Sequence, residues 1–281
     1  MNILKTVSAG SAFAAAMVIA SPAAAVVQTF ATFSAPTTAA NVTISNTGNS
    51  SSRAQDGRFY TTSTPQLVTP GPVVVRFSFL QPALAPYVTN VNASMNIFGT
   101  IAKGTPATLT TIPGFGTFFV QTGFSGSIKF LTTTAITVTA PNFVPYTYAI
   151  GSNLLTATFA GGSFSGKIGD TTGNANASSV GLATLTFTSD FLNFSSAVSR
   201  DAALALTSVA PTFRVGRGAN RSLSSLRANL GGQFSSDPVP LVNGLAVALV
   251  PEPAVWGMLI VGFGMVGVQT RRRGRSTIVT G

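Results

Sequence analysis

Apolar and polar residues alternate along much of the chain between residues 26 and 250. A period of two is typical of β-strands that bury one face and expose the other to solvent. The apolar members of the clearest runs are Val73, Val75, Phe77 and Phe79; Ile128 and Phe130; Ile136 and Val138; Leu155, Ala157 and Phe159; and Ala183, Leu185 and Phe187. Hydroxyl side chains hold most of the intervening positions. This pattern predicts an all-β body, residues 26–234, folded as an antiparallel β-sandwich.

Residues that favour turns separate these runs. Clusters of Gly, Pro, Asn and Asp predict turns at residues 70–72, 113–116, 161–162 and 170–174. Residues 45–58 and 211–222 are expected to form exposed loops. Residues 222–230 fit a short helix or a strand equally well. Residues 235–250 are expected to form a linker or a last strand.

The N-terminal residues have the pattern of a secretory signal peptide. Lys5 supplies the positive charge, residues 9–20 form a short apolar stretch, and a run of alanines follows it. Small residues at Ala23 and Ala25 place cleavage before Val26. Residues 1–25 are therefore predicted to engage the secretion machinery and to be removed by signal peptidase.

A second apolar segment lies near the other end of the chain. Residues 254–268 carry no charge, and Trp256 sits where an interfacial aromatic anchor belongs. A cluster of arginines follows, consisting of Arg271, Arg272, Arg273 and Arg275. Positive charge favours the cytoplasmic side, so one transmembrane helix is expected in the inner membrane. The body would then lie outside the cytoplasm, with residues 276–281 as a short cytoplasmic tail.

The segment before this helix completes a motif. Pro251, Glu252 and Pro253 disfavour helix and leave the chain extended at the membrane surface. With Trp256, the Gly-rich apolar helix and the arginines, residues 251–275 resemble a PEP-CTERM sorting signal of the PEPxxWA subtype. The same tail is also called the ice-binding protein C-terminal domain. The resemblance implies recognition by an exosortase, a membrane enzyme of Gram-negative bacteria that make extracellular polysaccharide.

The composition argues against catalysis. The chain contains no Cys and no His, which removes the commonest general base and the usual zinc ligands. We expect no catalytic residues, no metal and no cofactor. Two alternatives remain open: an Asp-dependent hydrolase, which needs a facing pair of carboxylates, and a Ca²⁺ site at residues 170–176. The acids available to the body are Asp56, Asp170, Asp190, Asp201 and Asp237.

Net charge adds one candidate contact surface. The formal charge of +10 comes from 16 Lys and Arg against 6 Asp and Glu. Four of the arginines fall close together, namely Arg214, Arg217, Arg221 and Arg227. This cluster is a candidate contact for a polyanion such as exopolysaccharide. Because export removes the protein from the cytoplasm, nucleic acid is not expected as a partner.

Together these features predict an exported surface or matrix protein. We expect delivery through exosortase and a structural, exopolysaccharide-associated role without catalysis. The alternative is an adhesin for carbohydrate or ice, because Thr rows on a β-sheet repeat at about 4.8 by 6.8 Å.

Overall fold

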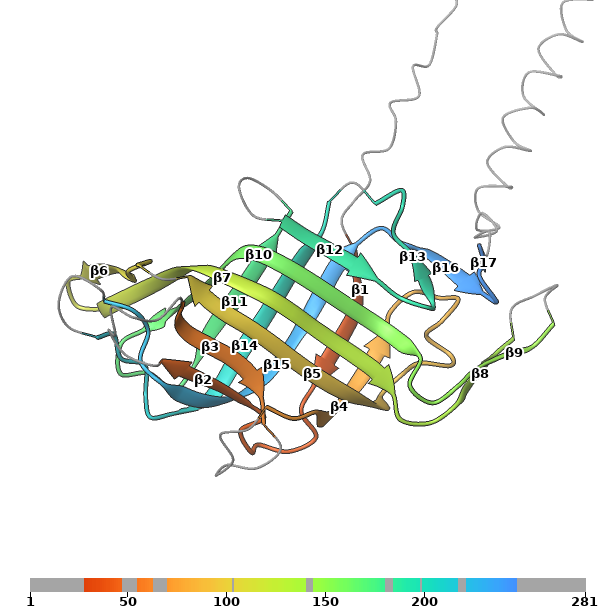
Figure 1. Cartoon of the computed structure of the whole chain (residues 1–281), viewed down its shortest axis with the longest axis horizontal. Coiled ribbons are helices and arrows are strands. Elements are labelled where there is room, and N and C mark those ends of the chain that lie inside the picture. The colour runs from red at the N-terminus through yellow and green to blue at the C-terminus, as the bar shows by residue number, and fades with distance from the viewer. Residues whose placement is uncertain are drawn as a thin grey trace, which may run out of the picture.

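A computed structural model describes most of the body (Figure 1). The described ranges of the chain are 28–46, 55–62, 70–102, 104–139, 144–179, 184–197, 199–216 and 221–246. The expected signal peptide, with Ala23, Ala25 and Val26, lies outside these ranges. So does the expected sorting segment from Pro251 to Arg275.

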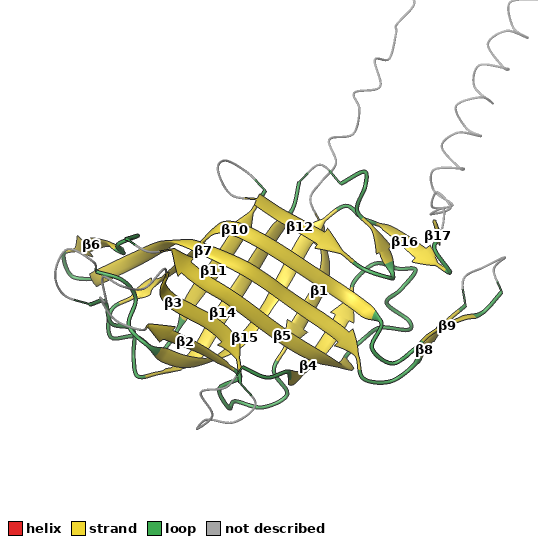
Figure 2. Cartoon of the chain, viewed as in Figure 1, coloured by secondary structure: helices red, strands yellow, loops and turns green. Residues whose placement is uncertain are grey.

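All regular structure in the described residues is β-strand (Figure 2). The strands are β1 (Gln28–Ser34), β2 (Val42–Asn46), β3 (Gln55–Thr61), β4 (Val73–Phe79), β5 (Val91–Ala102), β6 (Thr108–Ile112), β7 (Gly116–Thr132), β8 (Ile136–Val138), β9 (Tyr146–Tyr148), β10 (Asn153–Lys167), β11 (Gly173–Ser178), β12 (Thr184–Thr188), β13 (Leu192–Asn193), β14 (Asp201–Ala210), β15 (Leu226–Ser236), β16 (Val239–Val242) and β17 (Leu245–Ala246). The predicted all-β class is confirmed.

The strands form two layers, as expected for an antiparallel β-sandwich. β5, β7 and β10 cross the front of the molecule, and β1, β4, β14 and β15 cross behind them (Figure 1). The main sheet has the order β1-β4-β5-β3-β2-β15-β14-β11-β10-β7-β6, and β12 pairs with β10. Additional β1–β15 and β5–β7 pairings connect strands that are distant in this order. Backbone hydrogen bonding therefore runs continuously from one layer into the other.

Glycines allow the long strands to pass between the layers. Residues 156–160 of β10 pair with β12, whereas residues 163–166 pair with β11. The register shifts at Gly162, and Gly161 has φ of +77°, a value that favours glycine. The turn predicted at residues 161–162 is therefore wrong. The two glycines form a bulge inside β10, where they bend the strand without ending it.

Phenylalanine dominates the space between the layers. The inward faces of β4, β5, β7 and β10 carry the apolar alternation predicted from the sequence. Phe124 contacts Phe59, Phe159 and Phe164, with ring centroids 4.5 to 5.2 Å apart. Phe130 lies in a second group with Phe33 and Phe234. Tilted and edge-on ring pairs of this kind add to the stabilisation that burial itself provides.

Several connections differ from the expectation. Residues 45–46 and 55–58 belong to β2 and β3, which pair with each other, so the loop expected across residues 45–58 is shorter. The segment at residues 222–230 enters β15 and is a strand, which settles the open choice against a helix. β15 continues past residue 234, and β16 then pairs with β13.

A separate hairpin, β8–β9, projects from the end of the sandwich. Tyr148 attaches the hairpin to the body through two contacts. Its ring stacks on Phe191 with centroids 3.8 Å apart, and its hydroxyl donates a hydrogen bond to the Leu241 carbonyl at 3.0 Å. Burial raises the pKa of Tyr148 to about 12, with smaller upward contributions from Tyr146 and Asp190. A backbone hydrogen bond at Asn243 acts in the opposite direction.

Candidate functional site

The outer surface of the front layer carries a continuous row of side chains. Direct cross-strand pairing joins Tyr60 of β3, Phe98 of β5, Ser127 of β7, Thr158 of β10 and Thr186 of β12. Directly opposite residues lie about 5 Å apart and share one face of a sheet. Five segments that are distant in the sequence are therefore aligned across the molecule.

A second row runs beside the first. It joins Asn96, Lys129, Thr156 and Thr188 through the same pairings. Because these residues are two positions away along each strand, the rows lie about 6.8 Å apart. We call the nine residues of the two rows the polar face.

The polar face is rich in hydroxyl groups and includes two aromatic residues, of which Tyr60 is only 3% exposed. Phe98 is 53% exposed although it is large and apolar. Lys129 is also exposed and is the one charged residue of the nine. The Thr156 hydroxyl donates to Asn153 Oδ1 at 2.9 Å. A ring flanked by hydroxyl groups is suited to a sugar, which offers a C–H face and hydroxyls of its own.

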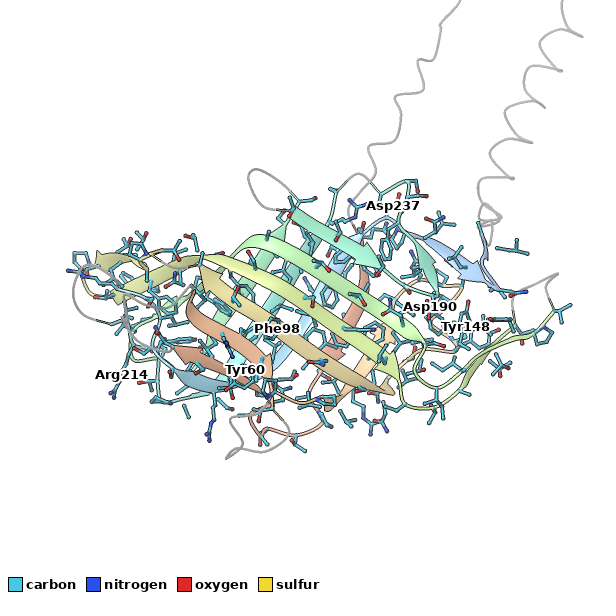
Figure 3. The ribbon with its side chains drawn as sticks, in the orientation of Figure 1. Tyr60, Phe98, Tyr148, Asp190, Arg214 and Asp237 are labelled. Carbon is cyan, nitrogen blue, oxygen red and sulfur yellow. The ribbon has the colours of Figure 1, made fainter. Side chains whose placement is uncertain are left out.

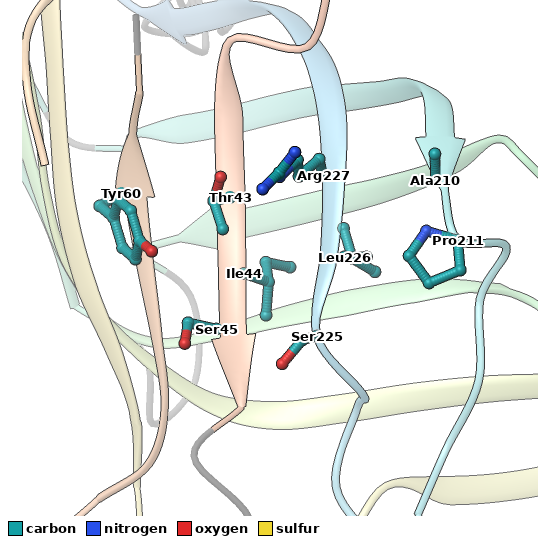
Figure 4. Close-up of a pocket in the computed structure, with 9 residues that line it drawn as sticks. All are labelled: Thr43, Ile44, Ser45, Tyr60, Ala210, Pro211, Ser225, Leu226 and Arg227. Carbon is teal, nitrogen blue, oxygen red and sulfur yellow. The ribbon is translucent and has the colours of Figure 1, made fainter. Parts of the chain in front are cut away.

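A cavity of about 500 Å³ opens beside the polar face (Figure 4). It lies where β2, β15 and the end of β14 meet, and its lining residues are Thr43, Ile44, Ser45, Tyr60, Ala210, Pro211, Ser225, Leu226 and Arg227. Tyr60 belongs both to this lining and to the first row of the polar face. Arg227 is the charged residue of the lining, and Thr43 Oγ1 is buried there without a hydrogen-bond partner among the described residues. The cavity thus offers a cation and hydroxyl groups to a polar ligand.

The structure describes three of the four arginines in the predicted cluster. Arg227 pairs across the sheet with Thr43 and Ala210. Arg214 and Arg221 are exposed, and the Arg214 carbonyl accepts the Ser224 backbone N–H at 2.8 Å. Arg217 lies outside the described residues. Among the described arginines of the cluster, Arg227 alone lines the cavity, so a polyanion contact through all four arginines stays a prediction.

Two of the described aspartates lie in or beside strands. Asp190 Oδ2 accepts the Asn153 backbone N–H at 2.7 Å, and Asp201 begins β14. Asp190 and Asp237 are marked in Figure 3. The Ca²⁺ loop considered at residues 170–176 is not a single loop, because β11 begins at Gly173. Within the described ranges, no three His, Cys, Asp or Glu residues are grouped as metal ligands would be.

The sequence reading missed Phe98 and Tyr60. Both positions follow directly after an inward apolar residue, Ile97 and Phe59 respectively, which is fully buried. Two consecutive large apolar residues in a strand must point to opposite faces. That local break in alternation marks a residue on the opposite face of the strand at each site, although only Phe98 is exposed there and Tyr60 is covered.

Comparison with known families identifies the other candidate site. Residues 249–273 match the PEP-CTERM protein-sorting motif, in agreement with the resemblance drawn from the sequence. No curated protein and no solved structure matched the chain. Among the residues that the structure describes, no helix is long and apolar enough to cross a membrane. The motif indicates an exported protein with a membrane-anchored sorting signal, and we conclude that this chain carries a PEP-CTERM protein-sorting motif at residues 249–273.

Proposed function

We propose that exosortase processes this protein after export and delivers it to the cell surface or the surrounding matrix. The match of residues 249–273 to the sorting motif carries this proposal. Its physical basis is the Pro251-Glu252-Pro253 sequence, which disfavours helix and stands directly before an apolar stretch that ends in arginines. Such a segment presents an accessible backbone to a membrane-bound protease.

The test replaces Pro251, Glu252 and Pro253 with alanine in the full chain. We expect the precursor to accumulate in the inner membrane with its C-terminal segment attached, as measured by fractionation and immunoblotting. Ser276→Ala with Thr277→Ala, beyond the arginines, serves as the matched control and is expected to sort normally. Normal surface delivery of the triple variant would refute the sorting proposal.

At the surface, the body is proposed to bind exopolysaccharide without catalysis. The polar face supports this role because it combines an exposed ring with ordered hydroxyl groups. Arg227 in the adjoining cavity is placed to meet an acidic sugar. The ligand class expected is therefore an acidic polysaccharide that lies along the rows and enters the cavity with one charged group.

Comparison of an acidic with a neutral polysaccharide tests this role. Mature protein carrying Lys129→Ala and Arg227→Ala is expected to lose most of its salt-dependent binding to an acidic exopolysaccharide in co-sedimentation. Binding to a neutral glucan should change little. Arg76→Ala, at an exposed position on β4, removes one positive charge and is compared with Lys129→Ala and Arg227→Ala made singly. An equal loss in Arg76→Ala would show that binding is non-specific.

An ice-binding role is the second candidate, favoured by the directly paired threonines. Thr156 lies opposite Thr188, and Thr158 lies opposite Thr186. Measurement of ice recrystallisation decides between the two roles: activity lost on Thr158→Val would favour ice, because the hydroxyl is removed at constant shape. Absence of any activity in the unmodified protein would eliminate this role.

A non-catalytic body is also part of the proposal. The chain offers neither His nor Cys, and Asp190 is engaged in a backbone hydrogen bond. A polysaccharide hydrolase that depended on a carboxylate pair would lose its activity in Asp190→Asn or Asp201→Asn. Release of reducing sugar ends by the unmodified protein, abolished in either variant, would overturn the proposal.

A further inference from the structure

The β8–β9 hairpin belongs to a long segment without charge. Between Lys129 and Lys167 the sequence contains no Asp, Glu, Lys or Arg. The hairpin itself is formed by the pairs Ile136–Tyr148 and Val138–Tyr146. A projection into water normally carries charged residues. The absence of charge from this hairpin indicates surroundings other than water alone.

Large apolar side chains are exposed at this end of the molecule, as others are at the β6–β7 end. Val144 is 84% exposed, Tyr146 is 36% exposed and Ile150 is 69% exposed. Leu245 of β17, at the same end in Figure 1, is 58% exposed. We call these four residues the apolar rim. Val138 and Ile136 of the same hairpin are buried, so the hairpin has one side in the core and one side uncovered.

The hairpin is held close to the point where the chain leaves the sandwich. The Tyr148 hydroxyl donates to the Leu241 carbonyl, and Leu241 pairs with Ala246. Tyr87 also binds the hairpin, because its hydroxyl donates to the Thr139 carbonyl. These contacts fix the hairpin next to β16 and β17 and give it a defined position relative to the chain exit.

The distance from this exit to the membrane is short. Ala246 is the last described residue, and the sorting motif begins at residue 249. Even fully extended, the five residues from Ala246 to Pro251 span at most about 18 Å. The end of the sandwich that carries the apolar rim must therefore lie near the bilayer surface while the motif is anchored.

We infer that the apolar rim rests in the lipid interface of the membrane for as long as the sorting motif anchors the chain. This inference rests on the proposed function, since it requires an anchored precursor. Lipid is the occupant that the rim fits: aliphatic side chains enter the acyl boundary, tyrosine favours the headgroup level, and a charge-free hairpin avoids the cost of burying charge. The contact orients the body and presents the sorting motif at a constant height above the bilayer.

The absence of native cysteine provides a direct test. Full-length chain with Val144→Cys is labelled with an environment-sensitive fluorophore and reconstituted into phosphatidylethanolamine–phosphatidylglycerol vesicles that contain nitroxide-labelled lipid. Phe115→Cys is the matched control, because Phe115 is a 70% exposed apolar residue in the turn between β6 and β7 at the opposite end (Figure 1). We expect at least a threefold greater quenching at position 144, together with a blue shift of the emission.

The outcomes separate this inference from the proposed function. A chain that inserts, resisting alkaline extraction, but shows equal quenching at both positions would overturn the rim contact and leave sorting intact. A chain that fails to insert would overturn the anchor and the rim together. Quenching at position 144 that appears only in native membranes containing exosortase would assign the rim to the enzyme and would refute a lipid contact.

Discussion

The polar face and the hairpin part of the apolar rim are connected through β7 and β10 but present opposite kinds of surface. β7 and β10 contribute Ser127, Lys129, Thr156 and Thr158 to the face, and the chain between them forms the hairpin of the rim. Both regions contain little charge. The face uses hydroxyl groups in register, whereas the rim exposes aliphatic side chains and a tyrosine.

If both proposals hold, low charge has two separate uses in this fold. Hydroxyl groups at strand spacing keep a surface wet and able to hydrogen-bond to a polysaccharide. Exposed aliphatic groups are tolerated where the chain approaches a bilayer, because burial in lipid removes them from water. Substitutions in the strand packing, in the rim and in the face test this difference separately.

The largest effect is expected from Gly126→Ala, which alters the contact between β5 and β7 next to Phe98 of the polar face. An added Cβ would lie 2.3 Å from the Phe98 carbonyl oxygen and 2.5 Å from Gly99 Cα. Backbone on both sides leaves no room for relaxation, so we expect a loss of about 3 kcal/mol or more in the free energy of unfolding. Gly71→Ala meets no atom within 4 Å and is the control. Equal denaturation midpoints for the two variants would contradict the packing described here.

Alkaline pH is expected to lower the free energy of unfolding through Tyr148, which attaches the β8–β9 hairpin of the rim to the body. The pKa of Tyr148 is about 12 in the folded protein against 10.0 when unperturbed. Because the unfolded chain releases this proton first, the stabilisation is complete below pH 10 and is lost as the pH rises from 10 to 12. A pKa difference of two units corresponds to a loss of up to about 3 kcal/mol in the free energy of unfolding.

Urea unfolding at pH 9 and pH 11.5 measures this dependence. Tyr148→Phe should lower stability at pH 9 by about 1 kcal/mol, because the hydrogen bond to Leu241 is lost. The same variant should lose less stability than the unmodified protein between the two pH values. Tyr146→Phe is the control on the same strand, and an unchanged pH dependence in Tyr148→Phe would refute this account of Tyr148.

A smaller effect is expected at the polar face from Phe98→Ala. Removal of the exposed ring should weaken polysaccharide binding about tenfold, equivalent to about 1.4 kcal/mol. The free energy of unfolding should change little, because the side chain is 53% exposed. Titration by calorimetry measures the affinity, and unchanged binding would exclude the ring from the site.

The smallest effect is expected from Thr186→Ala, at the edge of the same row. β12 pairs with β10 through this residue and Thr158, and loss of one exposed hydroxyl should reduce affinity by less than threefold, about 0.5 kcal/mol. A loss in the same titration that equals or exceeds that of Phe98→Ala would move the centre of the binding site toward β12.

Local pattern was enough to predict the strands but not the surfaces they build. Alternation identified the buried faces of β4 and β10, because each inward residue is marked by its own neighbours. It misread Gly161 and Gly162 as a turn, since a bulge and a turn require the same backbone freedom. Strand order was also inaccessible, so the alignment of Tyr60 with Phe98 and Thr186 could not be anticipated. The sorting motif was recognisable because its residues are contiguous.

The central claim is that the C-terminal motif directs export and processing, and intact-mass analysis of protein recovered from the cell surface tests it most directly. The account predicts one mature species that begins at Val26 and ends near Pro251-Glu252-Pro253, without the apolar segment and the arginines. A surface species with the mass of the whole chain from Met1 to Gly281 would contradict it.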